Sequence, residues 1–410
     1  MPTAGASAQS LLQHRSFVYF WLARTSTTAA TQMLGVAVGW QLYDITLNPL
    51  DLGLVGLMQF FPVVMLALLV GQIVDRYDRR LVARSCQTVK ALAAVGFLLG
   101  TAGGWLSREV VFALMFVTGC ARAFENPTMH ALVPGIVPQE ILPRAIAASA
   151  SANQTAVICG PAIGGLIYGA LGPMAVYATC TAVFAVAATL VSMLHSGGNV
   201  QSNRRITFET VFAGLTYIWS RPVILGAISL DLFAVLLGGV TALLPIYARD
   251  FLHTGPWGLG FLRSSPAVGA LMISVFLSRY SINRNAGKIM IATVMSYGAA
   301  IALFGLSNWL LLSMLALAAM GASDSISVII RHSLVQTRTP NEMLGRVMAV
   351  NSMFTGTSST LGEFRAGLVA FWLGATASVL VGGFGAIVLA LLWSRLFPDL
   401  YRVDSIVRKH

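Results

Sequence analysis

Charged residues are scarce in this sequence. Asp, Glu, Lys and Arg make up 10% of its 410 residues, whereas roughly a quarter is usual in a soluble globular protein. Hydrophobic residues make up 56% of the chain, and its mean hydropathy is +0.76. This composition excludes a soluble globular protein. Disordered, collagen-like and coiled-coil chains are also excluded, because the sequence lacks a polar bias, a Gly-X-Y repeat and a sustained heptad. A polytopic membrane protein remains.

The sequence also lacks the motifs of several kinds of chemistry. Its four cysteines are scattered without a CxxC pair, which indicates neither a disulfide framework nor a zinc site. A Walker A loop, a dinucleotide fingerprint, an HExxH motif and a G-x-S-x-G motif are all missing. We therefore expect no metal, no cofactor and no enzymatic activity. Energy for any transport has to come from an ion gradient or from the substrate itself, unless a partner subunit supplies an ATPase.

Apolar runs long enough to cross a bilayer, about 20 residues each, recur along the whole chain. The first six lie near 17–43, 52–74, 82–104, 110–131, 144–170 and 173–194, and the second six near 222–247, 257–279, 287–306, 309–330, 345–370 and 373–396. The stretch between the two sets is polar and rich in Gly, Asn and Arg, a composition typical of a linker. We predict an all-α integral membrane protein with twelve transmembrane helices. Its expected parts are an N-terminal six-helix bundle over 1–195, a cytoplasmic linker over 196–220, and a C-terminal six-helix bundle with a short cytoplasmic tail over 221–410.

The basic residues predict the orientation of these spans. The net charge is +11, and Lys and Arg gather in alternate loops, as in Arg76, Arg79, Arg80, Arg84, Arg144, Arg204, Arg205, Arg279, Arg284, Lys288, Arg331, Arg338 and Arg346. The opposite loops hold only Arg108 and Arg249 together with several acids. Since cytoplasmic loops carry the excess of Lys and Arg, the pattern predicts a multi-pass protein of the plasma membrane with both termini in the cytoplasm. The same reading makes nucleic acid an unexpected partner.

An internal repeat is visible about 200 residues apart. The segment PQEILPR at 138–144 recurs as PNEMLGR at 340–346, and a Leu-Val pair precedes each copy. Gly56 and Pro62 in the second span are echoed by Gly260 and Pro266 in the eighth. An even number of spans separates the copies, so the two six-helix bundles are parallel pseudo-repeats. This layout is typical of transporters with a substrate site at the middle of the membrane.

A motif in the loop between the second and third spans is the most specific local signal. It reads Gly71-Gln72-Ile73-Val74-Asp75-Arg76-Tyr77-Asp78-Arg79-Arg80, and it resembles the G-x-x-x-D-R-x-G-R-R loop of the major facilitator superfamily. The resemblance covers the whole chain and implies the twelve-helix fold of that superfamily. It also implies a gating role for Gly71, Asp75, Arg76, Arg79 and Arg80, with Asp75 meeting the end of the eleventh span in the outward-open state. Asp78 stands where the family pattern has glycine.

A second motif lies in the fifth span, where residues 160–165 read GPAIGG. Proline and glycine let this helix bend and pack closely on a neighbour. Gly160, Pro161, Gly164 and Gly165 resemble the antiporter signature of drug exporters in the superfamily. Segments such as FWLAR at 20–24, VAVGWQ at 36–41 and LGEF at 361–364 resemble the enterobactin-exporter-like branch. That branch contains siderophore exporters and multidrug efflux proteins of the bacterial inner membrane.

Charges at membrane depth are costly, and each is a functional hypothesis. The predicted spans contain four acids, Glu125, Asp231, Asp324 and Glu363, and four arginines, Arg24, Arg122, Arg263 and Arg365. Arg122 and Glu125, three residues apart, share a helix face. Arg122 also resembles an arginine that the family associates with proton transfer. The candidates for proton coupling are therefore Glu125, Asp231, Glu363 and Arg122. Asp324 lies two turns from Arg331, which favours a role in a cytoplasmic structural network.

These observations predict a secondary active transporter that exports amphipathic small molecules, siderophore or drug-like, by proton-coupled alternating access. We expect it to act as a monomer in the lipid bilayer. Its substrate-cavity candidates are Arg24, Gln32, Trp40, Gln59, Asn153, Arg263, Asn351 and Arg365. Two alternatives stay open. One is a lipid or lysophospholipid flippase or a nutrient importer of the same superfamily, and the other is a membrane sensor or scaffold without transport.

Overall fold

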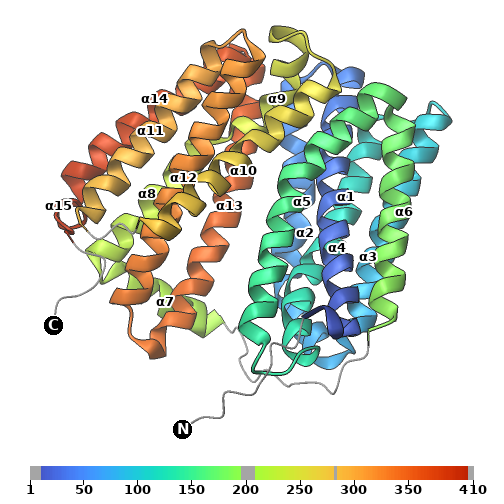
Figure 1. The fold of residues 1–410 in the computed structure, drawn as a ribbon. Coiled ribbons are helices and arrows are strands. Elements are labelled where there is room, and N and C mark those ends of the chain that lie inside the picture. Colours follow the sequence, from blue (N-terminus) through green and yellow to red (C-terminus); the bar gives the residue numbers. More distant parts are fainter. Residues whose placement is uncertain (1–10, 195–207, 281–283, 405–410) are drawn as a thin grey trace. The chain divides into compact units, whose positions relative to one another are not determined.

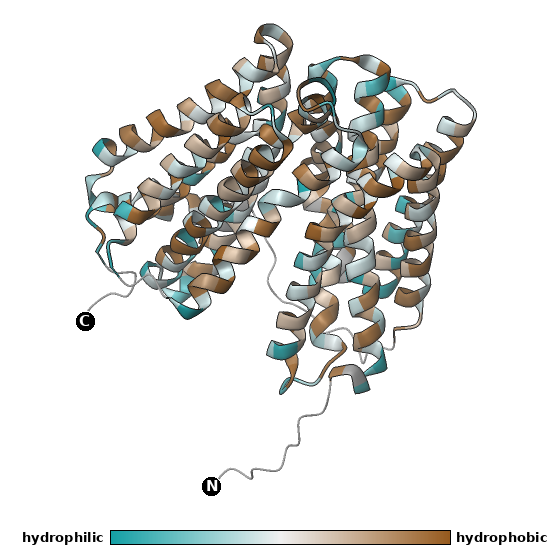
Figure 2. Cartoon of the chain, turned by 45° about the horizontal axis from the view of Figure 1, so that its top comes forward, coloured by the Kyte–Doolittle hydropathy of each residue, from teal (hydrophilic) through white to brown (hydrophobic). Residues whose placement is uncertain are grey.

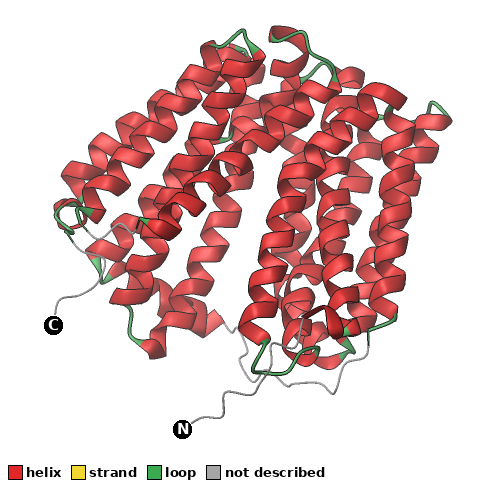
Figure 3. Cartoon of the chain, viewed as in Figure 1, coloured by secondary structure: helices red, strands yellow, loops and turns green. Residues whose placement is uncertain are grey.

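Helix is the regular secondary structure of this protein. The computed structural model describes residues 11–194, 208–280 and 284–404, and over these ranges it contains helices and short connections but no strand (Figure 3). The predicted all-α class is confirmed. Contacts divide the chain into two compact units. The first comprises Met1–Val38 and Met58–Arg205, and the second comprises Gly39–Leu57 and Ile206–His410.

The first unit is built from six long helices, drawn in blue to green in Figure 1. They are α1 (Arg15–Thr46), α2 (Pro49–Arg76), α3 (Arg79–Ala102), α4 (Arg108–Leu132), α5 (Leu142–Leu171) and α6 (Pro173–Ser192). Short 3-10 turns precede α1 at Leu11–Gln13 and follow α4 at Val133–Gly135. The adjoining ends of α1 and α2, residues 39–57, group with the second unit by their contacts.

The second unit contains the remaining helices. They are α7 (Phe208–Trp219), α8 (Pro222–Gly238), α9 (Leu244–Ile246), α10 (Pro256–Arg279), α11 (Ala286–Leu306), α12 (Leu310–Arg338), α13 (Asn341–Leu373), α14 (Ala375–Leu396) and α15 (Pro398–Tyr401). A 3-10 turn, Val240–Leu243, precedes α9, and a π-helical turn, Tyr247–Phe251, follows it.

Twelve spans are accounted for in the described ranges. Nine are long and apolar enough to cross a membrane, and hydrophobic residues predominate along the helices while hydrophilic ones gather in loops and at helix ends (Figure 2). The other three long helices, α1, α4 and α13, have 32, 25 and 33 residues. They carry charged side chains such as Arg24, Glu125 and Arg365, which lower their hydropathy. Other candidate functional residues, such as Asp231 on α8 and Arg263 on α10, lie on the nine apolar spans.

Each unit repeats the same packing. In the first, α3 packs against α4 and α6, and in the second, α11 packs against α12 and α14, the helices at the equivalent places in the repeat. The helices α5 and α13 end alike, at Gly172 (φ 81°) and Gly374 (φ 87°). A positive φ at these two turns favours glycine over any other residue. Because the two glycines are separated by the same interval as Pro138 and Pro340, the sequence repeat is a repeat of structure.

One expected helix boundary was wrong. The seventh span, expected near 222–247, is found over Pro222–Phe251, but it is not one continuous helix, because α8 ends at Gly238 and the chain passes through 3-10 and π turns before Phe251. The tenth span does not end before Arg331, because α12 continues to Arg338. Arg331 is therefore 2% exposed inside a helix and is not a residue of a cytoplasmic loop.

The predicted linker is partly helical. Its residues 208–219 form α7, which packs against α13. Arg204 and Arg205, which contributed to the predicted orientation, lie outside the described residues. The domain boundaries proposed from sequence, 1–195 and 221–410, stay predictions.

Glycines set the distance between α10 and α12. A Cβ on Gly321 would overlap the backbone of Pro266, and one on Gly269 would overlap the backbone of Ala318. Helices in a membrane approach this closely only where small residues face each other. The pairing of these two glycines therefore fixes the contact of α10 with α12.

We predict that Gly321→Ala lowers the stability of the protein by about 1–3 kcal/mol, the usual cost of overpacking, because backbone on both helices has to move apart. The measurement is reversible unfolding of the purified protein in detergent, followed by tryptophan fluorescence. Gly356→Ala on α13 is the matched control, since a Cβ there meets nothing within 4 Å, and it should be neutral or stabilise by up to about 1 kcal/mol. Equal stability of the two variants would contradict this packing.

Candidate functional site

Glu125 lies in a buried ion pair of the first unit. The Lys90 ammonium of α3 donates to Oε2 of Glu125 on α4, and the two residues are 4% and 6% exposed. Gln87 Nε2 donates to Oε1 at 2.7 Å, and Gln87 in turn accepts a hydrogen bond from Thr27 at 3.0 Å. Both carboxylate oxygens therefore have partners. A charge at this depth needs such compensation, so the pair ties α3 to α4.

Sequence reasoning missed Lys90. The sequence does show Lys90 as a charged residue in the interior of an apolar span. The comparison of four acids with four arginines did not include it. The expected shared face of Arg122 and Glu125 does not bring these two side chains together. Arg122 is exposed and donates from Nη1 to Gln59 Oε1 at 3.2 Å. The carboxylate turns to the neighbouring helix, where Lys90 offers a cation.

The glycine motif of α5 lies against α1. A Cβ on Gly160 would come within 3.0 Å of the Ala29 carbonyl oxygen, and one on Gly164 within 2.8 Å of Met33 Cα. Pro161 and Gly165 are buried in the same helix. The motif therefore serves close packing of α5 on α1 within the first unit.

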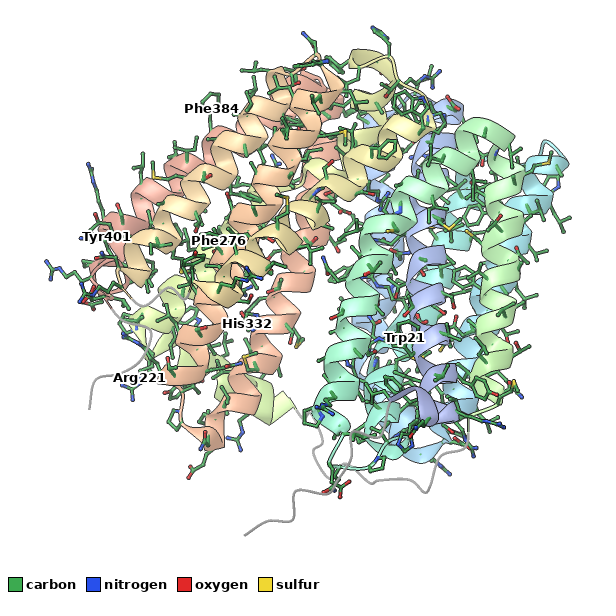
Figure 4. All side chains as sticks on the ribbon, viewed as in Figure 1. Trp21, Arg221, Phe276, His332, Phe384 and Tyr401 are labelled. Carbon is green, nitrogen blue, oxygen red and sulfur yellow. The ribbon has the colours of Figure 1, made fainter. Side chains whose placement is uncertain are left out.

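Polar side chains cross the same α1–α5 contact. Arg24 Nη1 donates to the Ser149 hydroxyl at 3.3 Å, and the Thr28 hydroxyl donates to Asn153 Oδ1 at 2.6 Å. Trp21 lies one turn before Arg24 (Figure 4), and its Nε1 donates to the Ala148 carbonyl oxygen at 3.2 Å. Gln32 is further along α1, beside Gly160. Three predicted substrate-cavity residues, Arg24, Gln32 and Asn153, thus lie along one contact.

Asp231 finds its partner in the second unit. Its carboxylate lies 3.1 Å from Arg331 Nη2, and the two residues are 3% and 2% exposed. Arg331 Nη1 also donates to Asn351 Oδ1 at 2.5 Å and to the Thr355 hydroxyl at 3.1 Å. One guanidinium therefore joins α8, α12 and α13. His332, labelled in Figure 4, follows Arg331 directly on α12.

This cluster also includes a predicted substrate-cavity residue. The Thr355 hydroxyl accepts a hydrogen bond from Arg331. So does Asn351, which is 3% exposed and stays a prediction as a substrate-cavity residue. The long side chain of Arg331 reaches it from α12, which spacing along α13 could not reveal.

Arg365 closes the broken end of α8. Its Nε donates to the Leu236 carbonyl oxygen at 3.1 Å, and its Nη2 donates to that of Leu237 at 2.7 Å. The last carbonyls of a helix have no partners within it and carry partial negative charge. A guanidinium satisfies both needs where the helix stops at Gly238. The expected substrate-cavity residue Arg365 is therefore a capping cation in this structure.

Glu363 lies on the same helix but faces elsewhere. It interacts electrostatically with Arg263 of α10, and its carboxylate lies beside Gly56 on the part of α2 that belongs to the second unit. Trp40, half-buried on α1, belongs to the same 39–57 segment. An ion pair of Asp44 with Arg249, 2.6 Å long, joins this segment to the π-helical turn.

The predicted gating loop is partly described. Arg79 Nη1 donates to the Ala131 carbonyl oxygen at 3.1 Å, and Arg80 Nη1 to that of Leu194 at 2.9 Å, so both arginines bind the ends of neighbouring helices. Arg76 is exposed. The surroundings of Gly71 and of the Asp75 side chain lie outside what the structure describes.

Asp78 has a structural explanation. It is the N-cap of α3, where its side chain accepts the backbone N–H of Arg80, a role for which aspartate is strongly preferred. The Arg80 side chain also hydrogen-bonds Asp78 and holds the pKa of that carboxyl below its usual range. A capping aspartate therefore stands where the family pattern has a glycine.

Comparison with known proteins decides the family. A family model described as a transmembrane secretion effector matches residues 6–410. The chain belongs to this family of the major facilitator superfamily. An enterobactin exporter of Citrobacter koseri is 24% identical over 394 residues, covering 96% of this chain and 94% of the relative. An enterobactin exporter of Escherichia coli is 23% identical over the same coverage. The recognition made from sequence is confirmed, and the protein is a multi-pass membrane transporter and not an enzyme.

Solved structures agree on the fold. A mutant of the nucleoside transporter NupG has a TM-score of 0.75 at 16% identity, covering 93% of this chain and 100% of that one. A bacterial homologue of the lysosomal transporter Spinster scores 0.74 at 11% identity, covering 94% and 98%. A bacterial homologue of ferroportin scores 0.68 at 18% identity, covering 94% and 100%. At these identities the likeness shows the fold alone.

We predict that Lys90→Met destabilises the protein by about 3–5 kcal/mol, because Glu125 is left buried without its cation. The double variant with Glu125→Gln should recover most of that loss, since no charge then remains in the cluster. Both changes are measured by unfolding in detergent. Arg122→Met, which removes an exposed hydrogen bond, is the control and should cost less than about 1 kcal/mol. A Lys90→Met protein as stable as the wild type would refute the pairing.

We predict that Arg365→Met frees the broken end of α8. Two carbonyl groups lose their donors, so amide hydrogen exchange over residues 238–243 should become at least several-fold faster in the lipid-reconstituted protein. Arg365→Lys, which keeps the charge but not the fork of donors, should fall between the two. Unchanged exchange in Arg365→Met would show that the break does not depend on this cation.

Proposed function

We propose that this transporter exports amphipathic small molecules, siderophore or drug-like, in exchange for protons. The observation that carries the proposal is the pair of buried charge clusters, Lys90 with Glu125 and Asp231 with Arg331, inside helices that cross the membrane. Buried ionisable groups in transporters mark substrate and proton pathways.

The direction of transport is supported by the relatives. The family model is described as a secretion effector, and the curated relatives at 23–24% identity are named enterobactin exporters. The glycine motif of α5, which resembles the antiporter signature of drug exporters, forms the contact with α1. These points favour export over import.

Proton coupling has four candidates from sequence, Glu125, Asp231, Glu363 and Arg122. A carboxylate beside a cation can exchange that cation for a proton when substrate competes for it. Asp231 and Glu125 each contact a buried cation, and Glu363 interacts with Arg263, which supports these three acids more than Arg122.

The substrate class follows from the residues that line the spans. Aromatic side chains such as Trp40 and arginines such as Arg24 and Arg263 suit an aromatic compound with anionic groups. Catecholate siderophores and many drugs share this chemistry. We propose that the transporter acts as a monomer.

We also propose the orientation. The arginine-rich loops, including the gating loop Gly71–Arg80, face the cytoplasm, and both termini lie on that side of the bacterial inner membrane. Asp75 then acts as a latch residue of the outward-open state, and the helix-end contacts of Arg79 and Arg80 support the loop around it.

The test is transport by the purified protein in proteoliposomes under an imposed pH gradient. We expect enterobactin to accumulate on the acidic side. Addition of a protonophore should abolish this accumulation, because the driving gradient disappears. Empty liposomes and liposomes treated with protonophore are the controls.

The alternatives predict other results. A lysophospholipid flippase would move labelled lysophospholipid between leaflets and leave enterobactin and dyes in place. An importer would move substrate in the same direction as the protons. A sensor or scaffold would show no flux of any probe.

A further inference from the structure

A small polar cavity lies inside the second unit, between α8, α11 and α12. It has a volume of about 10 Å³, room for about one water molecule. Its lining residues are Asp231, Ala234, Thr293, Val294, Tyr297, Ser323, Asp324 and Ser327. Oxygen atoms thus dominate the polar part of its wall, and the cavity is too small for any organic substrate.

The charges around this cavity do not balance. Asp231 and Asp324 both line it, and Arg331 is the cation that acts on both. Arg331 makes its ion pair with Asp231, at 3.1 Å. Two carboxylates that share one site cannot easily both stay ionised, so one of them takes up a proton.

A second observation points to the same place. The Ser327 hydroxyl lines the cavity and is 2% exposed. It acts on the Asp231 carboxylate as a hydrogen-bonding group, although it makes no hydrogen bond of ordinary geometry within the described part of the chain. A buried hydroxyl that lines a space of one-water size is suited to a small hydrogen-bonding occupant.

We infer that Asp231 and Asp324 share the coupling proton of this transporter, with Arg331 as the residue that positions it. The inference rests on the proposed function, which it extends by locating the proton. It adds Asp324, which sequence analysis had assigned to a structural network. It also sets aside Glu125, because Glu125 and Lys90 form a balanced pair of one acid and one cation, which leaves no unpaired carboxylate to protonate.

The groups that face this pair come from several helices. Tyr297 of α11 lines the cavity and interacts with both acids. Arg331 and His332 lie about two turns after Asp324 on α12. Arg365 of α13 interacts electrostatically with Tyr297. Arg263 of α10 acts on Glu363 instead. Among these, Arg331 is the cation that pairs directly with an acid of the cavity.

The arrangement links the proton to a helix movement. When the O–H bond of Asp324 breaks and its proton passes to water in the cavity, a second carboxylate competes for Arg331. Arg331 also holds α13 through Asn351 and Thr355. Deprotonation therefore pulls on the contact of α12 with α13, and reprotonation restores it.

The first experiment reads the proton directly, in the lipid-reconstituted protein without substrate. We expect the infrared spectrum of the wild type to show a protonated-carboxyl band that titrates with pH. Asp324→Asn and Asp231→Asn should each remove this band, because removal of either acid leaves one carboxylate balanced by Arg331. Asp399→Asn, the same change at an exposed acid of the same unit, is the control and should keep it. A band that persists in both variants would overturn the inference.

The second experiment uses the proteoliposome assay with enterobactin as the probe. Asp324→Asn should reduce accumulation driven by the pH gradient at least tenfold and leave exchange of labelled for unlabelled probe within about twofold of wild type. Asp399→Asn, the change at an exposed acid of the same unit, should keep its gradient response. If Asp231→Asn does not fold, because it removes the direct ion pair with Arg331, Asp324→Asn decides the matter alone.

The outcomes separate the two proposals. A wild-type protein that ignores a pH gradient contradicts the proposed function. A wild-type protein that responds, together with an Asp324→Asn variant that responds equally, contradicts only the assignment of the proton. Accumulation driven by a sodium gradient in the wild type, and lost in Asp324→Asn, would make the cavity a sodium site and would also overturn the assignment.

Discussion

A charge buried inside a membrane protein has to meet a partner, because neither lipid nor packed side chains can solvate it. The rest of this structure depends on that constraint. Lys90 and Glu125 join α3 to α4, while Arg331 joins α8, α12 and α13 through Asp231, Asn351 and Thr355. Replacing one partner leaves the other charge stranded, so each cluster specifies which helices lie together. Apolar side chains, which are as well solvated by lipid as by each other, provide much less of this specificity.

The backbone obeys the same constraint. A helix that stops at membrane depth exposes carbonyl groups that need donors. In this protein α8 stops at Gly238, and the donors come from Arg365 on a helix more than 100 residues later in the sequence. Glycines then allow the approach, since a Cβ on Gly239 would overlap the backbone of Gly362. A break in a span and a distant arginine are thus parts of one arrangement.

The two units satisfy the constraint differently, and the difference matters for transport. The cluster of the first unit is balanced, with one acid and one cation. The cluster of the second unit has two acids for one cation, beside a cavity of about 10 Å³. A balanced pair is suited to holding helices together, whereas an unbalanced one is suited to binding and releasing a small cation. One repeated fold can in this way carry a structural role in one half and a coupling role in the other.

The sequence by itself determined the class, the number of spans and the repeat. These depend on local composition: runs of about 20 apolar residues, a polar interruption near the middle, and the segments 138–144 and 340–346. The loop motif at Gly71–Arg80 was specific enough to indicate the superfamily, which the family model then confirmed. The charged residues inside the apolar spans were also visible in the sequence, Lys90 included, although Lys90 was not counted among the candidates.

Only the tertiary structure decided who pairs with whom. Glu125 turns to Lys90 and not to Arg122, and Arg331 is buried in an ion pair with Asp231 although it had been placed in a loop. Arg365 caps the end of α8. The physical reason is the length of these side chains. Lys, Arg and Glu reach across to a neighbouring helix, and which helix is the neighbour follows from packing that links residues far apart in the sequence.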